Sequence, residues 1–81
     1  MRKTVHSSQY QLLLDLLIAA RRRAKVTQIE LASSLKMTQS SVSKVERGER
    51  RLDVVELRAF CAAIGISFTS FVGKIEKVLD R

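Results

Sequence analysis

Apolar residues recur at three- and four-residue spacing along most of the chain, which is the period of an amphipathic helix. The clearest run lies near the N-terminus, at Tyr10, Leu13, Leu14, Leu17 and Ile18. Residues that favour strands do not alternate with polar residues between turn signals. The pattern therefore predicts an all-α fold of five helices.

Capping residues mark where the predicted helices begin and end. Thr27 is followed three residues later by Glu30, and Asp53 by Glu56, which is the capping-box pattern of a helix start. Short hydroxyl side chains suit the other N-caps, at Ser7 or Ser8, Thr38 and Ser67. The predicted helices cover about residues 8–23, 28–35, 39–47, 54–64 and 68–79, and Gly48 and Gly65 are expected to end the third and fourth.

The positive charge of the chain is confined to its first two thirds. Residues 1–51 hold eleven Lys or Arg and four Asp or Glu, which gives +7, whereas residues 52–81 hold four of each, which gives zero. A one-sided basic field favours a polyanionic partner, although a merely soluble basic surface is the alternative. Aromatic residues make up only 5% of the chain, too few for a reader of single strands, and Tyr10 is expected at the edge of the core.

Catalytic and metal-binding chemistry has little support in the sequence. Cys61 and His6 are the only residues of their types, so neither an internal disulfide nor a zinc site is expected. There is no glycine-rich phosphate loop and no acidic cluster spaced for a metal. We therefore expect no enzymatic activity, no cofactor and no metal.

The N-terminal region resembles a targeting signal only in outline. Residues 1–3 include two basic side chains, and residues 12–20 are rich in Leu. However, Asp15 interrupts this run, and three arginines follow it where a cleavage site would lie. An amphipathic first helix explains the segment better, so we expect one domain over residues 1–81, located in the cytoplasm and away from membranes.

Two of the predicted helices are unusually short and close together. Helices of this length, at residues 28–35 and 39–47, are not stable alone, and the tight turn between them makes them cross steeply. Ala32 falls where they would touch, and its small side chain permits a close approach. We therefore predict a helix-turn-helix over residues 27–48.

The outward face of the second of these helices is made of small polar groups and one cation, namely Gln39, Ser40, Ser41, Ser43 and Lys44. Serines lower helix propensity, so an ordinary solvated face would not favour them. They do suit a helix lying in the major groove of DNA, and the amide of Gln39 can bond adenine in bidentate fashion. In the alternative interpretation, residues 38–41 only cap the helix.

The sequence TQIELASSLKMTQSSVSKVERG at residues 27–48 resembles the helix-turn-helix of the Cro/phage-repressor family, also called the XRE family. The similarity is carried by Gln28, Ala32, Gln39 and the closing Glu-Arg-Gly, and it extends over about residues 13–71. It implies a lambda-repressor-like fold of five helices. It also implies a regulator of transcription that binds double-stranded DNA.

The resemblance assigns roles to the helical residues that would face DNA. Gln28 would bind a phosphate with help from the helix dipole, and Gln39 would read a base. Ser40 and Lys44 would contact bases or nearby phosphates, and Ser43 would have a weaker role. The complete expected DNA-contacting set is Thr27, Gln28, Thr38, Gln39, Ser40, Ser41, Ser43, Lys44, Arg47, Arg50 and Arg51.

The remaining charged residues divide into backbone contacts and a structural pair. By the same resemblance, three arginines would grip the DNA backbone: Arg47, Arg50 and Arg51. Glu46 would instead pair with Arg21 and tie the first helix to the third. Lys36 departs from the family pattern, which usually has Gly in this turn because the turn needs a positive φ, and Lys adopts it at a cost of about 1 kcal/mol.

One recognition helix reads only about half a turn of DNA, so a homodimer on a palindromic operator is expected, with half-sites about 34 Å apart or a multiple of this. The dimer surface should come from apolar residues that the core does not hide. The helix at residues 67–80 is the first choice, through Phe71, Val72, Ile75, Val78 and Leu79. The additional leucines of the first helix are the second choice.

Two other functions remain open at this point. The chain could be an interaction module that docks on a toxin or a polymerase, with DNA binding secondary. It could also bind nucleic acid without sequence preference.

Overall fold

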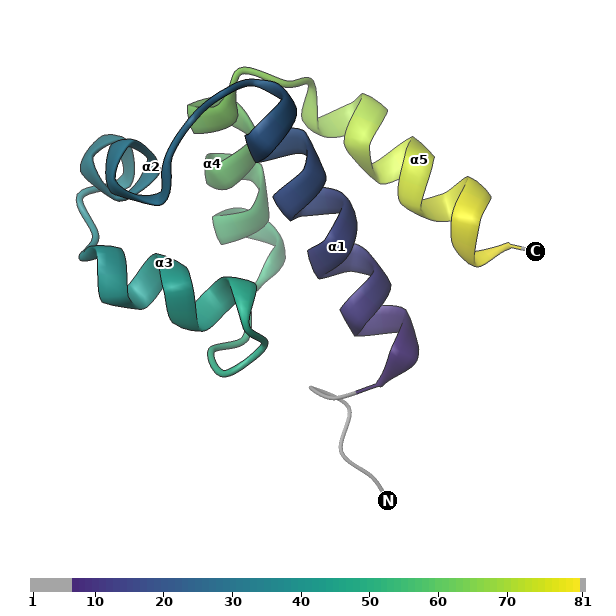
Figure 1. The fold of residues 1–81 in the computed structure, drawn as a ribbon. Coiled ribbons are helices and arrows are strands. Elements are labelled where there is room, and N and C mark those ends of the chain that lie inside the picture. The colour runs from purple at the N-terminus through teal and green to yellow at the C-terminus, as the bar shows by residue number, and fades with distance from the viewer. Residues whose placement is uncertain (1–6, 81) are drawn as a thin grey trace.

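The computed structural model describes residues 7–80, which form five α-helices and no strand (Figure 1). The helices are α1 (Ser8–Arg23), α2 (Gln28–Leu35), α3 (Gln39–Glu46), α4 (Val54–Ile64) and α5 (Phe68–Leu79). The all-α prediction is confirmed, and α3 ends one residue before the predicted position. His6, the basic residues at positions 2 and 3, and Arg81 lie outside the described residues.

Each helix starts where a short polar side chain accepts a hydrogen bond from the first turn. The N-caps are Ser7, Thr27, Thr38, Asp53 and Ser67, each bonded by the backbone N–H three residues later. Both predicted capping boxes are complete, because the side chains of Glu30 and Glu56 return to the N–H groups of Thr27 and Asp53. These bonds are local, so each helix start is specified by residues within one turn of it.

The first four helices end in the same arrangement, with a residue of left-handed conformation one or two positions after the helix. These residues are Lys25 (φ 61°), Lys36 (φ 56°), Gly48 (φ 79°) and Gly65 (φ 90°). In each case the N–H of the next residue donates back to a carbonyl five positions earlier, as from Met37 to Ala32 at 2.9 Å. This is the Schellman motif, which satisfies carbonyls that a helix end would leave unpaired.

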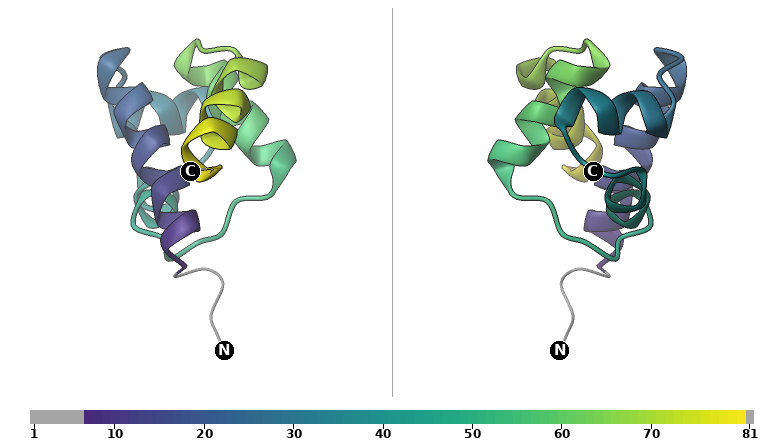
Figure 2. Two further views of the ribbon diagram at one scale, coloured as in Figure 1. Left: turned by 90° about the vertical axis from the view of Figure 1, so that its right-hand side faces the viewer. Right: turned by 90° about the vertical axis from the view of Figure 1, so that its left-hand side faces the viewer.

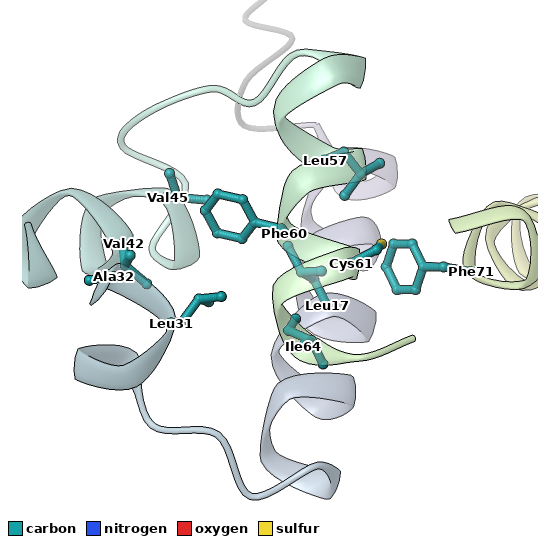
Figure 3. Packing of buried hydrophobic residues seen from close by; sticks show 10 residues of the cluster. All are labelled: Leu17, Leu31, Ala32, Val42, Val45, Leu57, Phe60, Cys61, Ile64 and Phe71. Carbon is teal, nitrogen blue, oxygen red and sulfur yellow. The ribbon is translucent and has the colours of Figure 1, made fainter. Parts of the chain in front are cut away.

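The core is built from all five helices, and α4 lies at its centre (Figure 3). Phe60 projects from α4 between the side chains of α2 and α3, and Cys61 and Ile64 lie on the side toward α1 and α5. Leu31, Val42 and Val45 are completely buried, so these positions of α2 and α3 belong to the core. Ala32 is 3% exposed, and α2 packs against α3, as the small side chain predicts.

The helices are arranged so that α2 and α3 lie on one side and α5 lies on the other, with α1 and α4 between them (Figure 1). The segment between α3 and α4 runs past the first turn of α1, as both views of Figure 2 show. No single helix within residues 7–80 is long and apolar enough to cross a membrane. Only α4 and α5 taken together have the length and composition for this, and they are bent against each other by 114°.

Candidate nucleic-acid interface

A buried ion pair holds α3 against α1. Arg21 Nε donates to Glu46 Oε2 at 2.6 Å, and Arg21 Nη2 donates to Glu46 Oε1 at 3.0 Å. The side chains are only 9% and 6% exposed, and the third guanidinium nitrogen donates to the carbonyl of Val26 at 2.9 Å. The structure therefore brings together the two residues that the resemblance paired. Two parallel hydrogen bonds join the guanidinium to the carboxylate, which is the bidentate geometry typical of strong Arg–carboxylate pairs.

Gln28 extends this network from the buried pair to the exposed face of α3. Its amide nitrogen donates to Glu46 Oε1 at 2.9 Å, and its carbonyl oxygen accepts a long hydrogen bond of 3.4 Å from Gln39 Nε2. The sequence suggested Gln28 only as a phosphate ligand and gave no sign of its bond to Glu46. In the structure Gln28 links the first turn of α2 to both ends of α3, so the two helices are oriented by one connected set of side chains.

The outer face of α3 presents the polar residues that the sequence singled out. Gln39, Ser40 and Lys44 are exposed, whereas Ser41 and Ser43 are half-buried. The intervening Val42 and Val45 are completely buried, so the helix cannot turn this face inward. An exposed amide, a hydroxyl and a cation on a short helix are groups that can bond base edges and phosphates in a major groove.

Capping accounts for part of the polar start of α3. The hydroxyl of Thr38 accepts from the N–H of Ser41 at 3.0 Å and donates to Ser41 Oγ at 3.0 Å. Thr27 caps α2 in the same way, because its hydroxyl accepts a hydrogen bond from the N–H of Glu30. For Thr27, Thr38 and Ser41 a structural role is therefore present in the free protein, and their contact with DNA stays a prediction.

Arg47, directly after α3, is paired with an acidic residue that the sequence interpretation did not assign to the site. Its guanidinium donates to Glu49 Oε2 at 2.9 Å and Oε1 at 3.1 Å, and it also donates to the hydroxyl of Ser43. Both side chains are 53% exposed. The hydrogen bonds and the charge of Arg47 lower the pKa of Glu49, and Glu49 in turn raises the pKa of Arg47, so both groups stay charged at neutral pH.

Arg50 and Arg51 lie in the segment between α3 and α4, and each is held by a different helix. Arg50 Nη2 donates to Glu56 Oε2 of α4 at 2.8 Å. The guanidinium of Arg51 lies over the ring of Tyr10 in α1, with 5.4 Å from its central carbon to the ring centroid. Tyr10 is half-buried, as expected for the edge of the core, and the sequence gave no signal for either contact.

The residues expected at a dimer surface do not share one environment. Phe71 is 4% exposed and belongs to the core of the single chain, so it is not a residue that the core leaves over. Val72 is 40% exposed, and Ile75, Val78 and Leu79 are half-buried. The expectation for Phe71 is corrected accordingly, because α5 turns this ring toward Cys61 (Figure 3).

Two short crossed helices on a shared core, with a polar outer face on the second, define a helix-turn-helix DNA-binding domain. The sequence pattern of the helix-turn-helix family matches residues 17–71. A solved structure, described as an XRE-family like protein from Pseudomonas syringae pv. tomato str. DC3000, is 49% identical to this chain. It matches with a TM-score of 0.86 over 93% of this chain and 92% of the other. No curated protein matches. The chain belongs to the XRE-type helix-turn-helix family and is a DNA-binding regulator with a lambda-repressor-like all-α fold.

Proposed function

We propose that the protein regulates transcription by binding a palindromic operator in double-stranded DNA as a homodimer. The observation that carries this proposal is the exposed face of α3, which is held in one orientation by the network of Arg21, Glu46 and Gln28. A recognition surface gains affinity and specificity when its orientation is fixed before binding. In a free helix of this length the same side chains would not be fixed.

The proposed division of labour follows from where each group lies. Gln39 reads a base, and the exposed Ser40 and Lys44 contact bases or adjacent phosphates. Gln28 reaches a phosphate from the first turn of α2, while the half-buried Ser43 contributes less. The arginines after α3 bind the DNA backbone and supply affinity that does not depend on sequence: Arg47, Arg50 and Arg51.

Dimerisation is proposed through α5, on the side of the domain away from α3. The apolar side chains that stay partly exposed there are Val72, Ile75, Val78 and Leu79. A second copy placed against them would bury this surface and set two recognition helices about 34 Å apart or a multiple of this, as a two-fold symmetric site requires. Sedimentation at concentrations on the order of tens of micromolar tests this step, because a monomer there contradicts it.

Selection of binding sites from a random duplex pool, followed by competition against random duplex, tests the main proposal. A regulator of this class prefers one palindromic site by several kcal/mol. Gln39→Ala and Lys44→Ala should reduce that preference, whereas Arg58→Ala, which removes one charge from the exposed side of α4, should leave it unchanged. The base-reading assignment fails if both α3 variants keep the full preference.

A cleft between α1 and α5 favours a second candidate, an interaction module that docks on another protein. The cleft has a volume of about 350 Å³ and is lined by Ala20, Arg23, Ala24, Ile66, Ser67, Ser70, Phe71 and Lys74. None of these residues belongs to α2 or α3, so a partner bound here would leave the DNA-reading helices open. Absence of any selected DNA site, together with unchanged binding to random duplex in the α3 variants, would favour this candidate.

A further inference from the structure

We propose that Tyr10 and Glu56 are positioning residues that hold the segment between α3 and α4 as a preformed clamp for the DNA backbone. This segment, residues 47–53, is called the α3–α4 loop below. The inference rests on the proposed function, because it concerns how the loop arginines meet phosphates. Neither Tyr10 nor Glu56 needs to touch DNA for this role.

Tyr10 holds the loop through both parts of its side chain. Its hydroxyl oxygen accepts a hydrogen bond of 3.1 Å from the backbone N–H of Leu52, across a sequence separation of 42 residues. Its ring lies under the guanidinium of Arg51 at 5.4 Å. A stacked guanidinium is held by its face, and stacking itself does not use the N–H groups at its edge. Tyr10 therefore fixes the direction of Arg51 and the backbone beside it.

Glu56 holds the other half of the loop from the first turn of α4. One carboxylate oxygen accepts from the N–H of Asp53 at 3.1 Å, which closes the capping box of α4. The other accepts from Arg50 Nη2 at 2.8 Å. A residue at this position in a capping box needs only one oxygen for the cap. The second oxygen therefore ties the orientation of Arg50 to the start of α4.

The two anchors lie on different helices and act on neighbouring arginines. Tyr10 comes from α1 and Glu56 from α4, while the loop also carries two backbone bonds to the carbonyl of Lys44 at the end of α3. A loop held at three points has little freedom left to lose when it meets a phosphate. A free loop with the same charges would bind the backbone more weakly, because ordering it would oppose binding.

Tyr10→Phe and Tyr10→Leu separate the two contacts of Tyr10. The Phe variant loses the hydroxyl and keeps the ring, and we expect binding to operator and to random duplex to weaken by the same factor, about three- to tenfold. The Leu variant also loses the surface on which Arg51 stacks. It should weaken binding further and lower the dependence of log affinity on log salt by up to about 1.

A double-mutant cycle distinguishes positioning from a general loss of stability. If Tyr10 acts through Arg51, then Arg51→Ala costs less in the Tyr10→Leu background than in the wild-type protein. Glu56→Gln and Arg50→Ala form the parallel cycle, since Gln retains an oxygen for the cap. Cys61→Ala, a buried substitution on α4 away from the loop, is the stability control and should leave DNA affinity unchanged at temperatures well below unfolding.

Additive costs in both cycles, or wild-type affinity in Tyr10→Phe and Tyr10→Leu, would overturn the inference. The measurements on random duplex keep this outcome apart from failure of the proposed function. If the wild-type protein prefers no palindromic site, the proposed function fails, while the cycles on random duplex still report whether the loop is positioned. If the preference exists and the cycles are additive, only the clamp is wrong.

Discussion

Glu46 and Arg47 are neighbours in the sequence, and each forms a two-bonded Arg–Glu ion pair, yet the two pairs differ in every other respect. The Arg21–Glu46 pair joins residues 25 apart and is almost completely buried. The Arg47–Glu49 pair joins residues two apart, and both side chains are 53% exposed. One step along the chain therefore separates a charge that faces the core from a charge that faces solvent.

The comparison shows how burial divides one kind of interaction into two roles. A buried charge cannot lose its partner without a large penalty, so Arg21 and Glu46 are held together whatever binds outside. An exposed pair gains little from its own attraction, so a phosphate can replace Glu49 as the partner of Arg47. The first pair fixes the recognition helix, and the second is suited to exchange on DNA.

Glu46→Ala should produce the largest effect, because it leaves Arg21 buried without a counter-charge. We expect a loss of about 3–5 kcal/mol in the free energy of unfolding, measured by urea denaturation. Glu49→Ala removes the same charge from the exposed pair and should leave the urea midpoint almost unchanged. Similar losses in the two variants would contradict the division into structural and exchangeable pairs.

Gln28→Ala should have an intermediate effect that combines both roles. Removal of the hydrogen bond to Glu46 should lower the free energy of unfolding by about 1–2 kcal/mol, because the acceptor is charged and buried. If Gln28 also binds a phosphate, DNA affinity falls by the same factor for operator and random duplex. Loss of stability with unchanged DNA binding would place Gln28 in the structural network alone.

Arg47→Ala should leave the stability unchanged and weaken DNA binding. We expect a loss of about three- to tenfold on all sequences and a decrease of about 1 in the salt slope, measured by titration at several salt concentrations. Lys77→Ala on α5 is the charge-matched control and should change neither quantity. An unchanged salt slope would show that Arg47 stays with Glu49 when DNA is bound.

Glu49→Gln should have the smallest effect and the opposite sign. It removes a competitor for Arg47 and a charge that repels phosphate, so binding to all sequences should tighten by about two- to threefold. The pKa of Glu49 is lowered in the folded protein, so its ion pair contributes to stability at pH values above the ordinary pKa of a carboxylate. This contribution is lost only as the pH falls through the pKa that Glu49 has in the folded protein. Glu49 is therefore charged at neutral pH, and the substitution removes its charge where a change of pH near neutrality does not. Weaker binding in this variant would mean that Glu49 itself contributes to recognition.

The helix starts were predictable from the sequence because the capping side chains bond within three residues. Thr27 with Glu30 and Asp53 with Glu56 form their boxes from residues that lie within one helical turn. The left-handed turn at Lys36 was expected only through the resemblance to the family, since Lys itself gives no such signal. The same conformation at Lys25 was missed for that reason.

Much of the site depends on contacts that no local pattern encodes. The bond from Gln28 to Glu46 spans 18 residues, and the bond from Leu52 to Tyr10 spans 42. Such contacts depend on how the helices cross and on the rotamers of long side chains. The amphipathic pattern of α5 likewise identified its apolar residues. It does not distinguish residues that pack in the core from residues that could contact a second copy. Phe71 was therefore expected at the dimer surface, whereas it is buried in the core of the single chain.

Lys25 and Lys36 end α1 and α2 in left-handed conformation and so flank α2, whereas Gly48 and Gly65 end α3 and α4 in the same conformation without strain. A non-glycine residue in this conformation costs about 1 kcal/mol. The two turns that flank α2 are therefore less stable than they would be with glycine at these positions. Substitution at these two lysines could therefore stabilise the folded domain without changing the outer face of α3. Exchange of these lysines for glycine would let α3 accept less stable combinations of side chains on its outer face, and so widen the range of sequences with which the scaffold can be redesigned.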